Sequence, residues 1–267
     1  MWETLIIEPF INFLLFIYDL IGENFGLAII LFTILIKLIT YPFTAKQIKS
    51  SKAIQDMQQD PDWIEIQKKY KNNRDKLAQE QMRFYKEKGI SPFASCLPTL
   101  IQFPIIIGLY QSIIQTMGNA PLQMFNLVPK ILPWFKDFFS FIPGLQDPLS
   151  LIPLNSQFLW MNIGKPDRIF IEGISFGIPL LAVIVVITSF LQTKLISPPT
   201  TDDQSSQMTG MMNIYIPILM GWFAYSLASG LALYFLTNNV FSIVQYAMLG
   251  RLNFKNLFSS RKAVDKK

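Results

Sequence analysis

The chain has 267 residues, of which 51% are hydrophobic and only 15% are charged, with a formal net charge of +5. Soluble domains usually carry about 25% charged residues, and the apolar residues here form long runs, so an integral membrane protein is predicted. The sequence has no histidine and one cysteine, Cys96. This excludes Ser-His and Cys-His nucleophile pairs and an intramolecular disulfide, and gives a four-ligand zinc site no support. We therefore expect this chain not to be an enzyme and to bind no metal ion or cofactor. The positive charge fits a cytoplasmic face beside anionic lipid headgroups better than nucleic-acid binding.

Residues 1–24 are predicted to form an amphipathic helix on the outer surface of the membrane. Their polar side chains share one helical stripe and their apolar side chains share the opposite face, a pattern typical of interfacial helices. The polar stripe holds Glu8, Asn12, Asp19 and Glu23, and the apolar face holds Phe10, Phe13, Leu14, Ile17 and Ile21. A short sixth span is the alternative, which is disfavoured because burying two or more carboxylates in lipid is costly.

Five later segments are long and apolar enough to cross about 30 Å of hydrocarbon, which takes roughly 20 residues. Each is expected to be a helix, because lipid offers no partner for open strand edges. The predicted spans are Leu27–Gln47, Leu97–Met117, Ile174–Lys194, Met211–Leu227 and Leu231–Leu249. They place the first span in 25–47, the second in 93–117 and the third to fifth in 173–250.

Lysine and arginine concentrate in residues 48–92 and in the short tail 251–267, whereas residues 1–24 have neither. The positive-inside rule therefore predicts an outside N-terminus and a cytoplasmic C-terminus. Between the second and third spans, residues 118–172 are rich in proline and aromatic residues. We expect short interfacial helices and turns there, on the outer side of the membrane.

Residues 48–92 are predicted to form a cytoplasmic helical hairpin. Asp60 and Pro61 form a helix start signal, and a second helix is expected from Arg74 to a glycine cap at Gly89. An apolar seam should join the two helices, since apolar residues recur at helical spacing in both. Candidate residues for the function of the hairpin are Trp63, Tyr70, Arg74 and Tyr85.

Lys37 lies ten residues into the first predicted span, where a charge costs about 3 kcal/mol on insertion scales. Helical spacing places it on one stripe with three threonines, Thr33, Thr40 and Thr44. No predicted span contains Asp or Glu, so a hydrated cavity that keeps Lys37 charged is favoured over a dry, paired site.

Polar stripes are also predicted on the second and fifth spans. They consist of Thr99, Gln102, Gln111 and Gln115 on the former and Tyr234, Asn238, Ser242 and Gln245 on the latter. Lining a watery cavity and plain hydrogen bonding between helices remain open for these residues. The missing acids and histidine exclude intramembrane aspartyl and rhomboid-type proteases and disfavour a proton-coupled carrier.

Three segments resemble the YidC/Oxa/Alb family of membrane insertases. Residues 33–47 are similar to the first core span of that family, which has Arg or Lys at the position of Lys37. Residues 91–104 resemble the second-span motif NPLxGCLPxLIQxP, and residues 230–245 resemble the fifth-span motif GLALYWxxNNxxxxxQ. The resemblance covers nearly the whole chain in the same order. Departures are Lys37 for the commoner Arg, which removes bidentate carboxylate binding, Ser91 for Asn and Phe235 for Trp.

The resemblance implies five transmembrane helices around a hydrophilic groove that is closed on the outer side of a bacterial plasma membrane. The groove charge would attract an acidic part of a nascent membrane protein, whose apolar segment then slides into the lipid bilayer. The implied groove residues are Lys37, Thr33, Thr40, Gln102, Tyr234 and Asn238. The Sec translocon and the ribosome are further expected partners. Two alternatives remain: an anion channel or carrier using Lys37, and an assembly factor acting through the hairpin.

Overall fold

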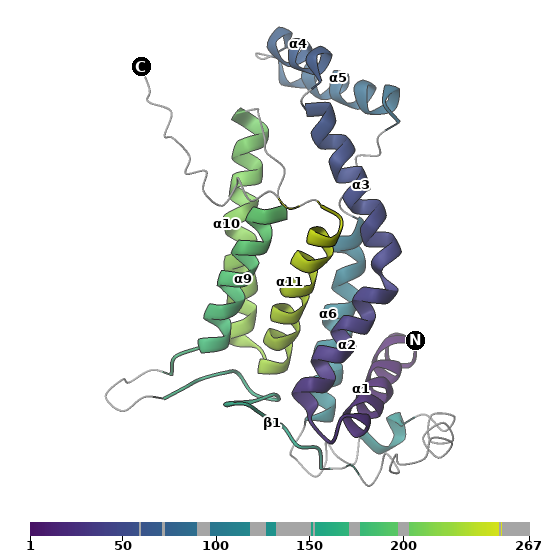
Figure 1. The fold of residues 1–267 in the computed structure, drawn as a ribbon, viewed down its shortest axis with the longest axis vertical. Coiled ribbons are helices and arrows are strands. Elements are labelled where there is room, and N and C mark those ends of the chain that lie inside the picture. Colours follow the sequence, from purple (N-terminus) through teal and green to yellow (C-terminus); the bar gives the residue numbers. More distant parts are fainter. Residues whose placement is uncertain are drawn as a thin grey trace.

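The computed structural model describes residues 1–58, 60–70, 73–89, 97–117, 127–131, 151, 153–170, 177–196, 203–250 and 252. The described part is mostly helical (Figure 1). The N-terminal half holds the π-helix η1 (Glu3–Ile7) and the helices α1 (Glu8–Leu20), α2 (Phe25–Ile39), α3 (Tyr41–Gln58), α4 (Pro61–Lys69), α5 (Arg74–Glu87) and α6 (Leu97–Thr116). These are followed by η2 (Val128–Lys130), β1 (Gln157–Phe158), β2 (Met161–Asn162), α9 (Leu180–Ile196), α10 (Asp203–Ser226) and α11 (Ser229–Met248).

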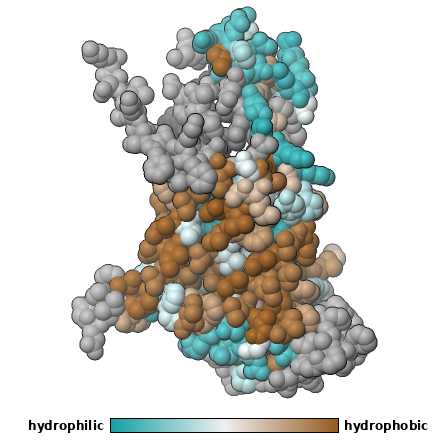
Figure 2. Space-filling model, in the orientation of Figure 1, coloured by the Kyte–Doolittle hydropathy of each residue, from teal (hydrophilic) through white to brown (hydrophobic). Residues whose placement is uncertain are grey.

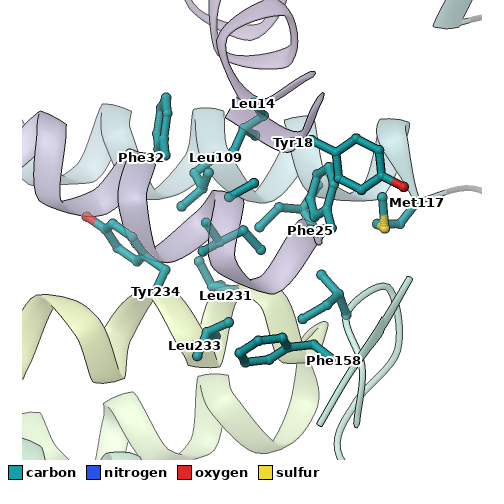
Figure 3. Close-up of a cluster of buried hydrophobic side chains, with 14 of the residues drawn as sticks. Leu14, Tyr18, Phe25, Phe32, Leu109, Met117, Phe158, Leu231, Leu233 and Tyr234 are labelled. Carbon is teal, nitrogen blue, oxygen red and sulfur yellow. The ribbon is translucent and has the colours of Figure 1, made fainter. Parts of the chain in front are cut away.

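Helix α11 lies at the centre of the bundle and packs against α2, α6, α9 and α10. In Figure 1, α9 and α10 cover one side of α11, and α1, α2 and α6 lie on the other. One apolar core joins these helices, with Phe25, Leu109 and Leu231 almost fully buried (Figure 3). Small side chains and a run of buried residues let α11 occupy this central position, because every side of its first two turns meets a neighbour.

Helix α1 folds back against α2 across a bend of 119°. The turn uses Gly22 and Glu23, both with positive φ, and the side chain of Asn24 then caps α2 by accepting from the Leu27 N–H at 3.0 Å. Asn12 was predicted on the polar face of this helix, but its side chain is buried, at 1% exposure. Its amide donates to the Lys130 carbonyl at 2.9 Å, because residues 127–131 cover this face of α1.

The first predicted span is not one continuous helix. Helix α2 ends at Ile39, and α3 begins at Tyr41. The Thr40 N–H still bonds to the Ile36 carbonyl at 2.9 Å, but Pro42 has no N–H to continue the helical ladder. The break therefore lies three residues after Lys37.

A β-hairpin occupies residues 157–162, where helices and turns were predicted. Its strands are only two residues long, and Leu159 adopts a positive φ of 53° in the turn. The ring of Phe158 lies against Gly26 at the start of α2. Such short strands leave no alternating pattern, so the sequence carries no signal for them.

The chain that follows the hairpin caps two helices. Main-chain carbonyls of Ile163 and Lys165 accept from the N–H groups of Gly230 and Ser229, at 2.9 and 2.8 Å, at the start of α11. The Asp167 carboxylate, 3% exposed, accepts from the Leu181 N–H at 2.7 Å at the start of α9. α9 therefore begins at Leu180, six residues after the predicted start at Ile174, and residues 171–176 lie outside the described part.

The helical hairpin α4–α5 follows the sequence closely. Asp60 accepts from the Asp62 N–H at 3.1 Å, and Asn73 accepts from the Lys76 N–H at 3.1 Å, so each helix starts on a side-chain cap. Gly89 adopts the left-handed conformation expected of a helix end. The hairpin has its own apolar core, formed by Met57, Trp63 and Phe84 with Ile66, Leu77 and Tyr85 packed against it.

Hydrophobic residues form a broad band across the face of the bundle shown in Figure 2, between hydrophilic ends at the hairpin and near β1. Large apolar side chains are exposed on the bundle helices, including Ile187 on α9 and Ile218 and Trp222 on α10. Within the described residues, no single helix has both the length and the hydropathy of a membrane span. Residues Glu3–Leu20 and Phe25–Ile39 reach them only as a bent pair, and α9 is a shorter apolar helix. The basic tail predicted for 251–267 lies outside the described residues except for residue 252.

Candidate functional site

The candidate site centres on Lys37, near the end of α2 that leads to α3. Its ammonium group donates to the Ser242 hydroxyl on α11 at 3.0 Å. That hydroxyl in turn donates to the main-chain carbonyl of Asn238 at 2.7 Å. A lysine from one helix is therefore held by a neutral, polar face of another.

No acid neutralises Lys37 within the described part of the chain. The ion pairs of the described residues involve Arg83, Lys88 and Lys130, and none of the helices α2, α6, α9 and α11 contains Asp or Glu. An ammonium group has three donor hydrogens, and the Ser242 bond uses one of them. The site thus presents a cation with donor capacity to spare.

Gln245 completes the polar face of α11. Its amide nitrogen donates to the Lys37 carbonyl at 3.4 Å, a long contact that places the Gln245 amide beside the α2 backbone. Two buried acceptor atoms on this face, Asn238 Oδ1 and Gln245 Oε1, have no partner among the described residues. Ser242 and Gln245 were recognised from sequence as part of a polar stripe but not as site residues. Their spacing of four and seven residues from Asn238 was the signal that marked them.

Gln102 and Tyr234 meet, as two of the predicted groove residues. The Gln102 amide donates to the Tyr234 hydroxyl and so links α6 to α11. Tyr234 is 1% exposed, and Figure 3 shows its ring at the edge of the apolar cluster with the hydroxyl directed away from the other labelled residues. Polar groups of α2 and α6 thus both bond to α11.

The threonine hydroxyls of the predicted Lys37 stripe bond to main-chain carbonyls and not to the Lys37 ammonium group, and that of Thr40 has a longer second contact with the Lys37 carbonyl at 3.4 Å. Thr33 donates to the Ile29 carbonyl at 2.6 Å and Thr40 to the Ile36 carbonyl at 2.8 Å. Both hydroxyls therefore satisfy their own helix, a common arrangement for threonine within an apolar helix. The side chain of Thr99 lies outside the described part.

Four hairpin residues were predicted to matter, and the structure brings two of them together. Trp63 is 2% exposed, and Tyr85 packs on the small core that Trp63 forms with Phe84. Tyr70 is the C-cap residue after α4, with the Lys69 ammonium 5.6 Å from its ring centre. Arg74 begins α5, and its side chain lies outside the described part.

An ion pair joins the two ends of the hairpin. Lys88 Nζ lies 2.8 Å from Asp60 Oδ2, so the residue directly after α5 pairs with the N-cap residue of α4. The hydrogen bond from Lys88 lowers the pKa of the Asp60 carboxyl, and the same bond raises the pKa of Lys88.

Comparison with known proteins agrees with this fold and these motifs. The model of the 60Kd inner membrane protein family matches residues 16–256, nearly the whole chain. The chain belongs to the YidC/Oxa/Alb family. The membrane protein insertase YidC of Oceanobacillus iheyensis is 31% identical over 258 residues, which cover 94% of this chain and 84% of that protein.

A chloroplast protein and a solved structure match the same region. The inner membrane protein ALBINO3 of Arabidopsis thaliana chloroplasts is 34% identical over 233 residues, covering 85% of this chain and 47% of its own length. A crystal structure of an active YidC insertase matches with a TM-score of 0.53 and 24% identity over 92% of this chain and 47% of that one. The chain thus spans about half the length of these two proteins, and the structural likeness concerns the fold.

Proposed function

We propose that this chain is a membrane protein insertase that draws part of a nascent membrane protein into the bilayer through the charge of Lys37. The observation that carries the proposal is a lysine held by neutral groups between apolar helices, with no acid beside it in the described part of the chain. Named insertases among the relatives support the same reaction. No chemical bond is made or broken, so the protein has no need of a catalytic residue or a cofactor.

Five membrane-spanning helices complete the proposal, with the N-terminus outside and the C-terminus in the cytoplasm. The apolar band in Figure 2 supports it, because the outward residues of α9 and α10 suit contact with lipid tails. The basic hairpin then lies on the cytoplasmic side, where nascent chains, the ribosome and the Sec translocon are encountered. The polar residues on α2, α6 and α11 line the proposed path of the substrate.

Lys37 acts on the substrate by electrostatic attraction. Two opposite charges about 4 Å apart gain roughly 4 kcal/mol at an effective dielectric constant of about 20. This gain offsets part of the cost of bringing a carboxylate into the apolar band, and hydrophobic transfer of the substrate span into lipid then drives its release.

The test is insertion of a single-span substrate into liposomes containing the purified chain. Lys37→Met should slow insertion at least tenfold for a substrate with an acidic outer tail and much less for the same tail with Asp→Asn. Lys37→Arg should retain activity. Lys46→Met, on an exposed lysine of α3, serves as the matched control. Equal insertion by the Lys37→Met variant and the unaltered chain would contradict the charge mechanism.

Two further measurements separate the other functions. An anion channel or carrier predicts anion flux in the same liposomes without substrate, and an insertase predicts none. Deleting residues 62–88 while keeping the bundle separates docking of a partner from insertion. Loss of partner binding with intact insertion into liposomes would assign docking to the hairpin.

A further inference from the structure

The polar face of α11 holds acceptors that the charge of Lys37 does not explain. Three buried side-chain atoms in the described part of the chain lack a hydrogen-bond partner: Trp63 Nε1, Asn238 Oδ1 and Gln245 Oε1. The last two lie seven residues apart on one face of α11, on either side of Ser242, which binds Lys37. Gln245 is 3% exposed. Leaving a buried acceptor unpaired is destabilising, so two of them beside the candidate cation point to a ligand.

The chemistry of the three groups restricts what can bind there. A carboxylate offers only acceptors, so it can pair with Lys37 but not with the amide oxygens of Asn238 and Gln245. A cationic side chain would supply donors, yet Lys37 would repel it. The remaining ligand is neutral and carries donors and acceptors side by side.

An unpaired peptide main chain has this composition. Each non-proline residue carries one N–H donor and one carbonyl acceptor, and both need partners away from water. We propose that the site binds the extended main chain of the substrate tail as it passes Lys37. Its N–H groups donate to Asn238 Oδ1 and Gln245 Oε1, and its carbonyl groups accept from the unused ammonium hydrogens of Lys37. This inference rests on the proposed function and names the part of the substrate that the same site recognises.

Proline provides a direct probe, because it keeps the chain extended but lacks the N–H. Two single-span substrates are compared in liposomes, with outer tails that share one Asp and are otherwise rich in Ala or in Pro. The unaltered chain should insert the Ala tail about tenfold faster than the Pro tail. An Asn238→Leu/Gln245→Met variant should insert the Ala tail about tenfold more slowly and leave the rate for the Pro tail unchanged.

Thermal unfolding separates ligand binding from a structural role. Asn238→Leu removes an acceptor that has no partner, so its unfolding temperature should equal or exceed that of the unaltered chain. The neighbouring Asn239 is the matched control, since its amide is hydrogen-bonded to the Ser189 hydroxyl of α9 at 2.7 Å. Asn239→Leu should therefore unfold several degrees lower.

Each outcome decides the inference. Equal slowing of both tails by the double variant, or no slowing of either, would overturn it. Equal insertion of the two tails by the unaltered chain would also overturn it, even if the double variant failed to fold. In all three cases the Lys37→Met result stands separately, so charge attraction and main-chain binding succeed or fail independently.

Discussion

The contact between Gly26 and Phe158 gives a packing prediction whose size follows from the structure. A Cβ atom built on Gly26 lies 2.1 Å from Phe158 Cγ and 2.3 and 2.6 Å from its two Cδ atoms. Cβ atoms in proteins essentially never approach atoms of residues elsewhere in the chain within 3.0 Å. Gly26→Ala therefore has to displace either the first turn of α2 or the β-hairpin that carries Phe158.

The sign of the effect on stability depends on this contact. In an unobstructed helix, Gly→Ala stabilises a protein by roughly 0.5–1 kcal/mol, whereas overpacking a filled core costs about 1–3 kcal/mol. The contact is tight and Phe158 is only 9% exposed, so we expect a net loss of about 1–2 kcal/mol. That loss lowers the unfolding temperature by about 2–8 °C in a chain of this size.

Thermal unfolding in detergent would measure this effect in Gly26→Ala, Phe158→Ala and the double variant. Phe158→Ala leaves a cavity and should cost about 3–5 kcal/mol, and the added methyl group of the double variant should then cost nothing further. Leu27→Ala, at an exposed neighbouring position, should change stability by less than about 0.5 kcal/mol. An unaltered or raised unfolding temperature for Gly26→Ala, or additive losses in the double variant, would refute the contact.

Three further predictions concern caps and the hairpin. Asp167→Ala should destabilise the chain by about 1–3 kcal/mol, because the buried Leu181 N–H loses its acceptor. The Asp60–Lys88 pair should make the hairpin acid-sensitive. The hydrogen bond from Lys88 lowers the pKa of the Asp60 carboxyl in the folded chain below its ordinary value of 3.8. The stability that Asp60 contributes is therefore complete above pH 3.8 and is lost as the pH falls through the lower pKa of the folded state. Trp63→Ala should lower the free energy of unfolding by about 3–5 kcal/mol. Trp63→Phe should lower it far less, because it keeps a ring in the core and removes a buried N–H that has no partner among the described residues.

Matched variants check each of these. Asp167→Asn keeps an acceptor oxygen and should recover most of the unfolding temperature lost in Asp167→Ala. Hydrogen exchange of the α4 and α5 amides, followed from pH 6 downward, should show acid sensitivity that disappears in Asp60→Asn. An equal loss of stability in Trp63→Phe and Trp63→Ala would mean that the indole N–H is bonded after all.

Local signals explain which parts of the fold were predictable. The helix start at Asp60-Pro61 and the helix end at Gly89 were predicted correctly, because these residues act within one helical turn of their own position. Lys37 was identified because a charge within an apolar run is costly wherever its neighbours lie. Polar residues at helical spacing in otherwise apolar segments marked Gln102 and Tyr234, and only the structure shows that these two side chains bond to each other.

Long-range contacts explain what the sequence concealed. Asn12 occupies a polar position on its own helix, and only the cover of residues 127–131 makes it buried. The β-hairpin is too short for an alternating pattern, and it is held by the long-range contact of Phe158 with Gly26. The starts of α9 and α11 are likewise capped from far along the chain, by residues that follow the hairpin. The hydroxyl of Thr33 has a choice between its own helix and the site, and its sequence position does not decide between them.

The starts of α9 and α11 differ in how strongly each restricts the residue type at its capping position. α11 begins on the carbonyl oxygens of residues 163 and 165, which every amino acid supplies, so Lys165 can change type while the cap persists. α9 begins on the carboxylate of Asp167, which few residues can replace. Natural variation among relatives that share this arrangement should therefore accumulate at position 165 and avoid position 167, two residues away.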